Sequence, residues 1–275
     1  MKKVLLVILF CLFSLPSFAD EGKGSAYDRV IRTNTLRCGV MLWPPYFEKD
    51  ANTAVMSGFG VDFYNAVAQI LDVKIEYVEI IVGQQAEDLN RGKIDAVCND
   101  GPYVFSAMKF VDYSMPAYFG PIYIFVREDN QVISSIGDLN NESVRFIGMD
   151  GDISADLVER RFPKASLSTL PATSDAASLM MQVITGKADA VYIDKPPVDG
   201  FNAMNSPKLK MINEARPVVY PVGMSVKKGE QELLNMLNSG IAALWNSGGA
   251  LPIIQKYDPD LKMILPLAKP YEMGH

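Results

Sequence analysis

The sequence has 275 residues, with 26 lysines and arginines against 32 aspartates and glutamates, and its net charge is -6 at pH 7. An acidic chain disfavours nucleic acid and anionic membrane surfaces as partners. The single histidine is the last residue, His275, which nearly excludes histidine-based catalysis and His-rich metal sites.

The N-terminus has the pattern of a secretory signal peptide. Lys2 and Lys3 are followed by an apolar run and then by Ser-Phe-Ala before Asp20, in the stretch MKKVLLVILFCLFSLPSFAD. This small-x-small ending is typical of a cleavage site. We predict that residues 1–19 are removed on export and that the mature chain is periplasmic. An N-terminal membrane anchor is the alternative, but Pro16 and the shortness of the run argue against it.

Two cysteines, Cys38 and Cys98, lie in the predicted mature chain, each within an apolar, strand-like run. In an oxidising compartment they could form a disulfide, but buried free thiols are the interpretation that we favour from the sequence. Their spacing matches no metal site. We therefore expect neither a metal nor a cofactor.

Strand-like and helix-like runs alternate along most of the chain, which predicts an α/β fold with largely parallel sheets. The order is strand, helix, strand, helix, strand, and it occurs twice. The length allows one large domain or two small ones, each with its own core. The predicted strands are residues 36–40, 73–80, 94–98, 144–149, 166–170 and 188–193, and the predicted helices are 60–71, 153–162 and 174–186.

One internal repetition in the sequence supports the prediction that the same order of strands and helices occurs twice. RGKIDAVCND (91–100) and TGKADAVYID (185–194) share Gly-Lys-x-Asp-Ala-Val and end in an aspartate at the same offset. A glycine after a helix, then a lysine and a strand, is common in α/β proteins, so chance similarity is the alternative. In both copies the aspartate, Asp100 or Asp194, follows a predicted parallel strand, where open α/β sheets bind their ligands.

The two copies predict two lobes that face each other, with Asp100 and Asp194 on opposite walls of a cleft. Two extended stretches, YFGPIYIFVRED (118–129) and PVVYPVGMSVKKG (217–229), are predicted to cross between the lobes as strands. The amphipathic stretch 229–257 is then predicted to pack back on the first lobe. We predict residues 20–123 and 223–275 for the first lobe and 124–222 for the second.

A resemblance to a known family covers nearly the whole predicted mature chain. It rests on six stretches: LRCGVMLWPPYFEKD, SGFGVDFYNAVAQIL, DLNRGKIDAV, KFVDYSMPAYFGPIYIFVRED, TGKADAVYIDKP and LLNMLNSGIAALWNSGG. In order and spacing they resemble the bacterial extracellular solute-binding proteins of family 3, the periplasmic receptors of polar-amino-acid ABC transporters. The resemblance implies the type II periplasmic binding protein fold, in which two α/β lobes joined by two hinge strands close on a ligand.

The resemblance also implies ligand-contacting positions. Trp43 stands in the place of the aromatic that covers the ligand side chain, and Asp194 in that of the acid that takes the ligand ammonium. The turn DGDIS (150–154) replaces a Gly-Thr-Thr-like turn that meets the ligand carboxylate, and Ser154 keeps a hydroxyl at a predicted helix N-terminus. Together with nearby polar and aromatic groups, the predicted ligand-binding residues are Trp43, Tyr46, Asp100, Tyr103, Asp152, Ser154, Tyr192 and Asp194.

One family feature is missing from this sequence. In amino-acid receptors of the family, an arginine five residues before the Asp of an Asp-Phe-Ser-like motif grips the ligand carboxylate. Asp112 is that Asp, and Ala107 takes the place of the arginine. With Asp100, Asp152 and Asp194 near the cleft, a ligand carboxylate would meet like charges. We therefore expect a cationic or donor-rich ligand beneath aromatic side chains.

Five of the predicted contacts have a structural alternative. Asp100 and Asp152 could face solvent or cap helices. Trp43 and Tyr46 could belong to a lobe core, and Tyr192 could pack between strands. Binding of amino acids could also be restored if Lys109 or Lys195 turned into the cleft.

The sequence therefore predicts a monomeric periplasmic receptor that delivers a small polar molecule to an inner-membrane ABC permease. One alternative is an enzyme, a dehydratase of the cyclohexadienyl kind on the same scaffold, with cleft carboxylates as general acid or base. Because the substrates of such an enzyme are carboxylates, loss of the arginine disfavours it, and we expect no catalysis. Another alternative is a receptor that presents its ligand to a sensor instead of a transporter.

Overall fold

The computed structural model describes residues 24–102, 107–212 and 218–268. The predicted signal peptide and Tyr103 lie outside the described residues. Within them, strands and helices alternate, which confirms the predicted α/β class. In these ranges there is no helix with the length and apolar character that a membrane span requires.

The elements follow the predicted runs closely, and each predicted boundary lies within about two residues of the observed one. The helices are α1 Ala26–Thr33, α2 Phe59–Ile70, α3 Gln85–Asn90, α4 Ser154–Arg161, α5 Ala176–Ile184, α6 Lys195–Met204, α7 Gln231–Asn246 and α8 Ala250–Tyr257, with a 3-10 turn η1 at Ile136–Leu139. The strands are β1 Thr35–Val40, β2 Glu48–Lys49, β3 Met56–Ser57, β4 Lys74–Glu79, β5 Ala96–Asp100, β6 Val111–Tyr113, β7 Tyr118–Arg127, β8 Arg145–Met149, β9 Ser166–Leu170, β10 Ala190–Asp194, β11 Leu209–Met211 and β12 Val218–Lys227.

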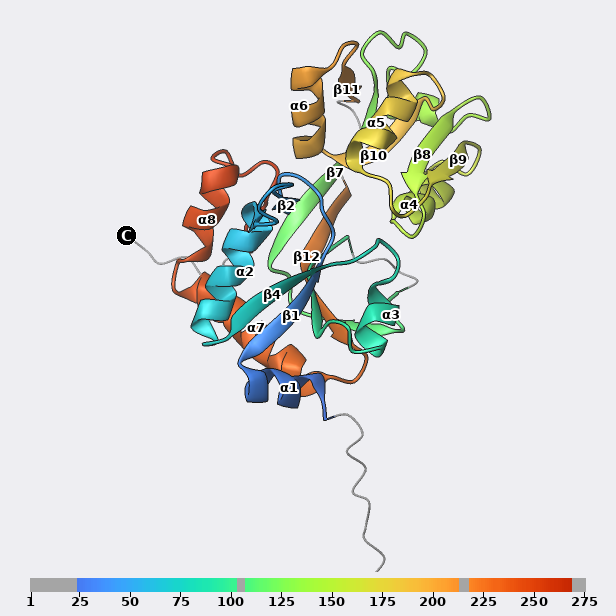
Figure 1. The fold of residues 1–275 in the computed structure, drawn as a ribbon. Helices are drawn as coiled ribbons and strands as arrows, with labels where there is room; N and C mark the ends of the chain where they lie inside the picture. The colour runs from blue at the N-terminus through green and yellow to red at the C-terminus, as the bar shows by residue number, and fades with distance from the viewer. Residues whose placement is uncertain (1–23, 103–106, 213–217, 269–275) are drawn as a thin grey trace, which may run out of the picture.

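Two long strands, β7 and β12, join the two halves of the molecule (Figure 1). The strand order is β4-β1-β5-β12-β7-β10-β8-β9, with β6 paired to β12 and β11 to β7. We call the half that contains β1, β4 and β5 the first lobe and the half that contains β8, β9 and β10 the second lobe. The predicted crossing strands are thereby confirmed, whereas the predicted lobe boundaries fall inside β7 and β12 and stay a prediction.

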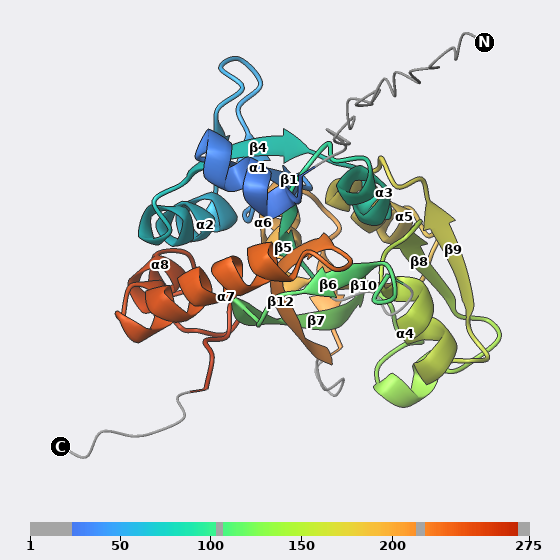
Figure 2. The ribbon, with the colours of Figure 1, turned by 90° about the horizontal axis from the view of Figure 1, so that it is seen from below.

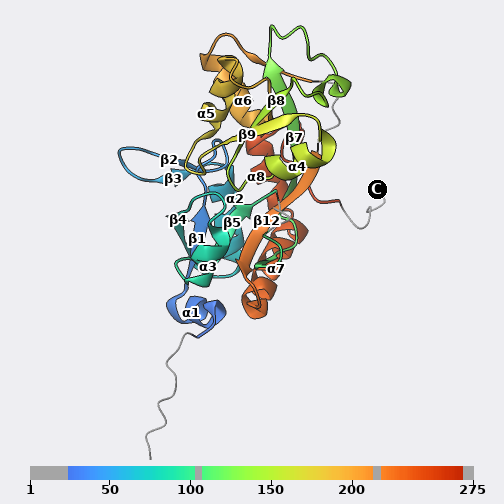
Figure 3. The ribbon, with the colours of Figure 1, turned by 90° about the vertical axis from the view of Figure 1, so that its right-hand side faces the viewer.

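Helices cover both faces of each lobe. Helices α2, α7 and α8 contact one another in the first lobe, and Figure 2 shows α3 on the other side of β5 and β12 from α2 and α8. In the second lobe, α4 contacts β8, and α5 and α6 contact β10. Figure 3 shows α4 on the opposite side of β8 from α5 and α6. Such coverage is what buried parallel strands require.

The internal repetition corresponds to a repeated ion pair at the base of each lobe. In the first lobe, Asp95 accepts hydrogen bonds from the backbone N–H of Arg37, at 2.7 Å, and from its guanidinium. In the second lobe, Asp189 does the same with Arg145, whose N–H lies 2.9 Å away. Bidentate arginine–carboxylate pairs have a fixed geometry, so each pair holds the first strand of its lobe against the third.

Sequence reasoning missed or merged several helices. Helix α6 begins with Lys195-Pro-Pro, which is compatible with a helix only in its first turn, and the single predicted stretch 229–257 is in fact two helices. Gly248, with φ of +79°, separates α7 from α8, because a left-handed residue ends a helix. Helices α1 and α3 are short, with eight and six residues, and too few of their side chains are buried to produce a clear pattern.

The sequence-based preference for free thiols is wrong. Cys38 and Cys98 form a disulfide between β1 and β5, with 5.7 Å between their Cα atoms. The two strands are parallel neighbours, and Cys38 lies opposite Ala96, so both thiols reach the same face of the sheet. This register could not be read from the sequence. The expected burial is confirmed, since both residues are at most 1% exposed.

Candidate functional site

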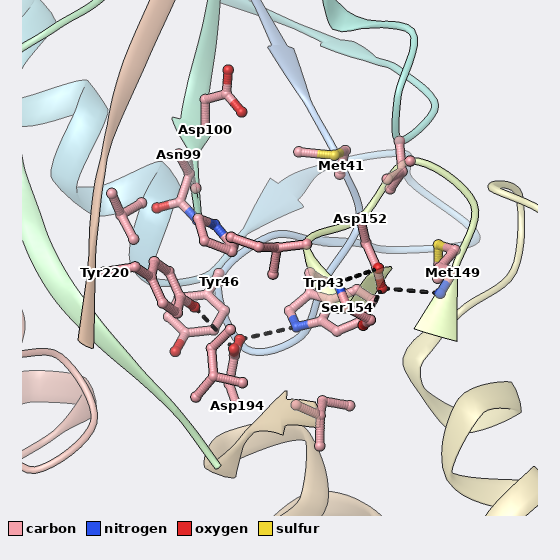
Figure 4. A pocket seen from close by; sticks show the side chains of 18 of the residues that line it. Met41, Trp43, Tyr46, Asn99, Asp100, Met149, Asp152, Ser154, Asp194 and Tyr220 are labelled. Carbon is pink, nitrogen blue, oxygen red and sulfur yellow. Dashed lines mark hydrogen bonds between the residues drawn. The ribbon is translucent and has the colours of Figure 1, made fainter. Parts of the chain in front are cut away.

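A cavity of about 140 Å³ lies between the lobes. Its wall combines side chains from the first lobe, the crossing strands and the second lobe (Figure 4). Each predicted ligand-binding residue within the described ranges lines this cavity, although their contact with a ligand stays a prediction. These residues are Trp43, Tyr46, Asp100, Asp152, Ser154, Tyr192 and Asp194.

Asp194 ends β10 and lies at the centre of the site (Figure 4). Its Oδ2 accepts a hydrogen bond from Trp43 Nε1 at 3.2 Å, and its Oδ1 accepts one from the Tyr220 hydroxyl at 3.0 Å. Burial raises the pKa of Asp194 to about 6, against the lowering effect of these two donors. Both donors are neutral, so the charge of the ionised carboxylate is not balanced by them.

Aromatic side chains surround Asp194. Trp43 and Tyr46 come from one turn of the first lobe, in which the Tyr46 N–H donates to the Trp43 carbonyl at 2.8 Å. Tyr118 and Tyr220 come from the crossing strands β7 and β12. Burial raises the pKa of Tyr46, Tyr118 and Tyr220, and the negative charge of Asp194 raises each of them further. The site is therefore an aromatic enclosure around one carboxylate.

The crossing strands place Tyr118 and Tyr220 in the site, and sequence reasoning missed both. Gly120 lies opposite Tyr220 in the ladder, and a Cβ atom there would come within 3.2 Å of the tyrosine ring. The missing side chain leaves room for Tyr220 to reach Asp194. Tyr118 donates to Asn99 Oδ1 at 2.6 Å. Their location in the predicted crossing strands could have indicated this role, because strands that cross between two lobes must border the cleft.

Asp152 and Ser154 lie in the turn between β8 and α4. Asp152 Oδ1 accepts from the Ser154 N–H at 2.8 Å, and its Oδ2 accepts from the Met149 N–H and the Ser154 hydroxyl, both at 3.0 Å. Burial raises the pKa of Asp152, although these donors oppose the shift. A Cβ atom on Gly148 would lie 2.7 Å from Ser154 Cβ, so glycine allows α4 to start close against β8.

Asp100 ends β5 and is 4% exposed. Its carboxylate forms a short hydrogen bond with the Ser225 hydroxyl of β12, and Figure 4 shows it directed away from Asp194. Burial raises its pKa to about 6, while the bond from Ser225 lowers it. Asp100 thus borders the cavity, but its Oδ2 serves the contact between β5 and β12.

Tyr192 has the packing role that was the alternative in the sequence analysis. Its ring stacks on Phe146 and Phe162, with centroids 5.9 and 6.3 Å away. The hydroxyl has no hydrogen-bond partner of normal geometry among the described residues. Burial raises its pKa to about 12, opposed by the positive charge of Arg161. Tyr192 forms part of the cavity wall but belongs mainly to the core under α4.

The charges of the cavity have one sign. Its described lining contains Asp100, Asp152 and Asp194 and no lysine, arginine or histidine. Neither lysine considered as a substitute cation is part of that lining. Lys109 is exposed, with its Nζ 4.9 Å from the centre of the Phe110 ring, and Lys195 pairs with Asp199 on α6. Among the described residues of the lining, a carboxylate would therefore find no positively charged partner.

The sequence from residue 36 to residue 259 matches the model of one family, the bacterial extracellular solute-binding proteins, family 3. The chain belongs to this family. It is 24% identical over 265 residues to the L-arginine-binding protein of Pseudomonas aeruginosa, covering 94% of this chain and 96% of the relative.

Solved structures of type II periplasmic binding proteins have the same fold as this solute-binding protein. One is the ancestral amino acid-binding protein AncCDT-1, a precursor of cyclohexadienyl dehydratase, with a TM-score of 0.71, 28% identity and coverage of 85% of this chain and 99% of that chain. Another is an ancestral arginine-binding protein bound to arginine, with a TM-score of 0.71, 26% identity and coverage of 82% and 98%. The expected fold and family are thereby confirmed.

The two lobes of this solute-binding protein touch each other across the cavity. One contact is the hydrogen bond from Trp43 in the first lobe to Asp194 in the second. Another joins two glycines with positive φ, Gly83 at +80° and Gly151 at +84°. A Cβ atom on Gly151 would lie 2.9 Å from Gly83 Cα, so the two backbones pack directly. The structure is therefore a conformation with the lobes in contact.

Proposed function

We propose that this family 3 protein is the periplasmic receptor of an ABC transporter and that it captures a small cationic or donor-rich molecule by closing its lobes. The family supports a solute-binding role, and the L-arginine-binding relative supports a ligand with a positively charged group. An inner-membrane permease is the partner that would receive the ligand. Closure requires a ligand that binds the closed form better than the open form.

The observation that carries this proposal is the charge of the cavity. Three aspartates and no basic residue line its described part. A carboxylate brought into a partly desolvated site beside like charges would lose several kcal/mol. A cation would be attracted both to the aspartate carboxylates and to the faces of the aromatic rings.

Asp194 is the group that would hold the cation. Each of its oxygens accepts one hydrogen bond from the protein, and a carboxylate oxygen has room for about two. An ammonium could therefore bind Asp194 while Trp43 and Tyr220 stay in place. The rings of Trp43, Tyr46 and Tyr220 would add cation–π attraction, worth roughly 2 kcal/mol where water is excluded.

The described residues that line the cavity include no counterpart of the family's carboxylate-binding arginine. Ala107, which takes its place in the sequence, is not among the residues that line the cavity, and its carbonyl accepts backbone bonds from Phe110 and Val111. Asp112, the landmark of the motif, binds Gly229 and Gln231 at the start of α7. These contacts of Ala107 and Asp112 support a structural role for the surroundings of the motif.

A thermal-shift screen of residues 20–275 tests the proposal. The chain is unfolded and refolded to remove any carried-over ligand, then mixed with amines, quaternary ammonium ions, polyamines, nucleobases, sugars and amino acids. A ligand at a hundred times its dissociation constant adds ~2.7 kcal/mol of stability. We expect shifts with cationic or donor-rich compounds, and no such shifts in the variant Asp194→Asn.

Asp199→Asn is the matched control for this screen. It removes the same charge from the neighbouring helix α6, where Asp199 pairs with Lys195 outside the cavity, so its ligand shifts should equal those of the natural chain. Shifts with standard amino acids alone, or equal shifts with and without Asp194, would overturn the proposal.

An enzyme is the second candidate, because Asp100 and Asp194 have pKa values of about 6, a range that suits proton transfer near neutral pH. The likeness to a precursor of cyclohexadienyl dehydratase points the same way. Against it, the resemblance described in the sequence analysis implies carboxylate substrates, and the described cavity lining is acidic. Incubation with cyclohexadienyl carboxylates should therefore yield no product.

A further inference from the structure

The turn before α4 already holds a carboxylate, and that carboxylate belongs to the protein. Three donors converge on Asp152: the backbone N–H of Met149, the backbone N–H of Ser154 and the hydroxyl of Ser154, at 2.8 to 3.0 Å. Both carboxylate oxygens are engaged. Figure 4 shows this group beside Trp43 in the wall of the cavity.

An incoming ligand carboxylate would need the same three donors. They stand at the N-terminus of α4, where aligned peptide dipoles favour negative charge, and the described cavity lining offers no positively charged group as an alternative partner. Asp152 is tethered two residues from Ser154, so its effective concentration at the turn far exceeds that of any free ligand. A ligand carboxylate would have to displace it and would then lie against it.

We propose that Asp152 determines specificity by occupying the turn that would otherwise bind a ligand carboxylate. The receptor thereby rejects molecules with a free carboxylate and accepts the corresponding amines. This inference deepens the proposed function and rests on it, since it names the ligand class of the same cavity.

A purely structural role makes a different prediction. If Asp152 only caps α4, its replacement lowers the stability of the second lobe and leaves ligand selectivity unchanged. If it fills a carboxylate site, its replacement changes selectivity in one direction, toward carboxylates. The affinity for amines should stay nearly constant, because the proposed ammonium partner is Asp194, on the other side of Trp43.

The test compares dissociation constants for two pairs of probes that differ in a carboxylate: L-arginine with agmatine, and glycine betaine with choline. Isothermal titration is done on refolded residues 20–275 and on Asp152→Ser, whose hydroxyl keeps a capping group. In the natural chain each amine should bind more tightly than its carboxylate partner. In Asp152→Ser that preference should fall by about tenfold or more, through tighter binding of L-arginine or glycine betaine.

Two further variants make the test specific. Asp150→Ser removes a charge from the same turn, but Asp150 is exposed and is not among the residues that line the cavity, so the preference should not change. If circular dichroism shows that Asp152→Ser is unfolded, Asp152→Asn takes its place, because it keeps the shape of the side chain and removes the charge. In this variant the preference for the probe without a carboxylate should again fall.

The outcomes separate this inference from the proposed function. An unchanged preference in the folded Asp152 variants, or an equal change in Asp150→Ser, overturns the role of Asp152. If the natural chain binds no cationic or donor-rich compound of the thermal-shift screen, the proposed function fails. The role of Asp152 is then tested by the binding of L-arginine and glycine betaine to Asp152→Ser. New binding of either compound supports that role, and no binding of either overturns it.

Discussion

At the scale of single residues, the proposed choice of ligand depends on Asp194. Its carboxylate is buried among aromatic rings, and its hydrogen-bond donors, Trp43 and Tyr220, carry no charge. Burial therefore raises its pKa to about 6, from an ordinary value near 4. In the empty protein the ionised carboxylate of Asp194 has no positive partner, which lowers the stability of the folded state. A bound cation would supply the missing positive charge and remove this cost.

The affinity for a cation should fall as the pH falls through 6. A cation binds the ionised form of Asp194, and at pH 5 only about one molecule in ten has Asp194 ionised. For choline, whose charge does not titrate, we expect a dissociation constant about tenfold larger at pH 5 than at pH 7.5. Titration calorimetry at both pH values measures this, and equal or tighter binding at pH 5 would contradict it.

Asp194→Asn should stabilise the empty protein at neutral pH. Because the folded-state pKa is raised, the folded chain binds the proton more tightly, and this contribution to stability is present below about pH 4 and lost as the pH rises through 6. The neutral amide avoids that loss, so the free energy of unfolding should increase by roughly 1–3 kcal/mol at pH 7.5.

Urea unfolding of both chains at pH 7.5 and pH 4 checks this prediction. The difference should shrink toward zero at pH 4, where the natural chain is also neutral at Asp194. A variant that is less stable than the natural chain at pH 7.5 would show that the hydrogen bonds from Trp43 and Tyr220 outweigh the buried charge.

At the scale of elements, periodicity predicted the strands and most helices, because each buries one regular face. It missed α6, where two prolines stand in the first turn, and it merged α7 with α8, which only the left-handed Gly248 separates. It also misjudged Cys38 and Cys98, because their pairing depends on which strands are neighbours. Contacts between separate elements are thus what sequence patterns leave open.

The disulfide between β1 and β5 should add measurable stability. It links residues 60 positions apart, and closing a loop of this length in the unfolded chain is worth about 2–4 kcal/mol. Reductant should lower the free energy of unfolding of the natural chain by that amount and leave Cys38→Ala/Cys98→Ala unchanged. If reductant has no effect on the natural chain, or if its thiols react freely without it, the prediction fails.

Gly151→Ala should weaken ligand binding without replacing any of the side chains that are proposed to act on the ligand. The added Cβ atom would lie 2.9 Å from Gly83 Cα and would hold the lobes apart. Any ligand that requires closure should then bind about tenfold more weakly, and small-angle scattering should show a more extended liganded state.

Gly186→Ala is the control for this prediction. Gly186 also has a positive φ, +72°, but its added Cβ atom would meet nothing within 4 Å. It shares the backbone strain and lacks the contact between lobes, so it should lower stability alone. Equal affinities in the natural chain and Gly151→Ala would show that the two glycines do not govern closure.

At the scale of the whole molecule, two lobes and two crossing strands place a few residues from distant parts of the chain around one cavity. The repeated Gly-Lys-x-Asp-Ala-Val pattern predicted the doubling, and its final aspartates, Asp100 and Asp194, both reach the cavity. Their environments differ, since Asp100 bonds Ser225 whereas Asp194 faces Trp43 and Tyr220. Equivalent positions in the sequence therefore have different roles, because different side chains of the crossing strand β12 contact them.

The central claim is that the cavity binds a cation at Asp194 and has no carboxylate clamp. A crystal structure of the refolded chain with the compound of largest thermal shift tests it most directly. We predict a positively charged nitrogen beside Asp194, enclosed by Trp43, Tyr46 and Tyr220, with Asp152 still bonded to Ser154. An α-amino acid whose carboxylate has replaced that of Asp152 at the start of α4 would contradict the claim.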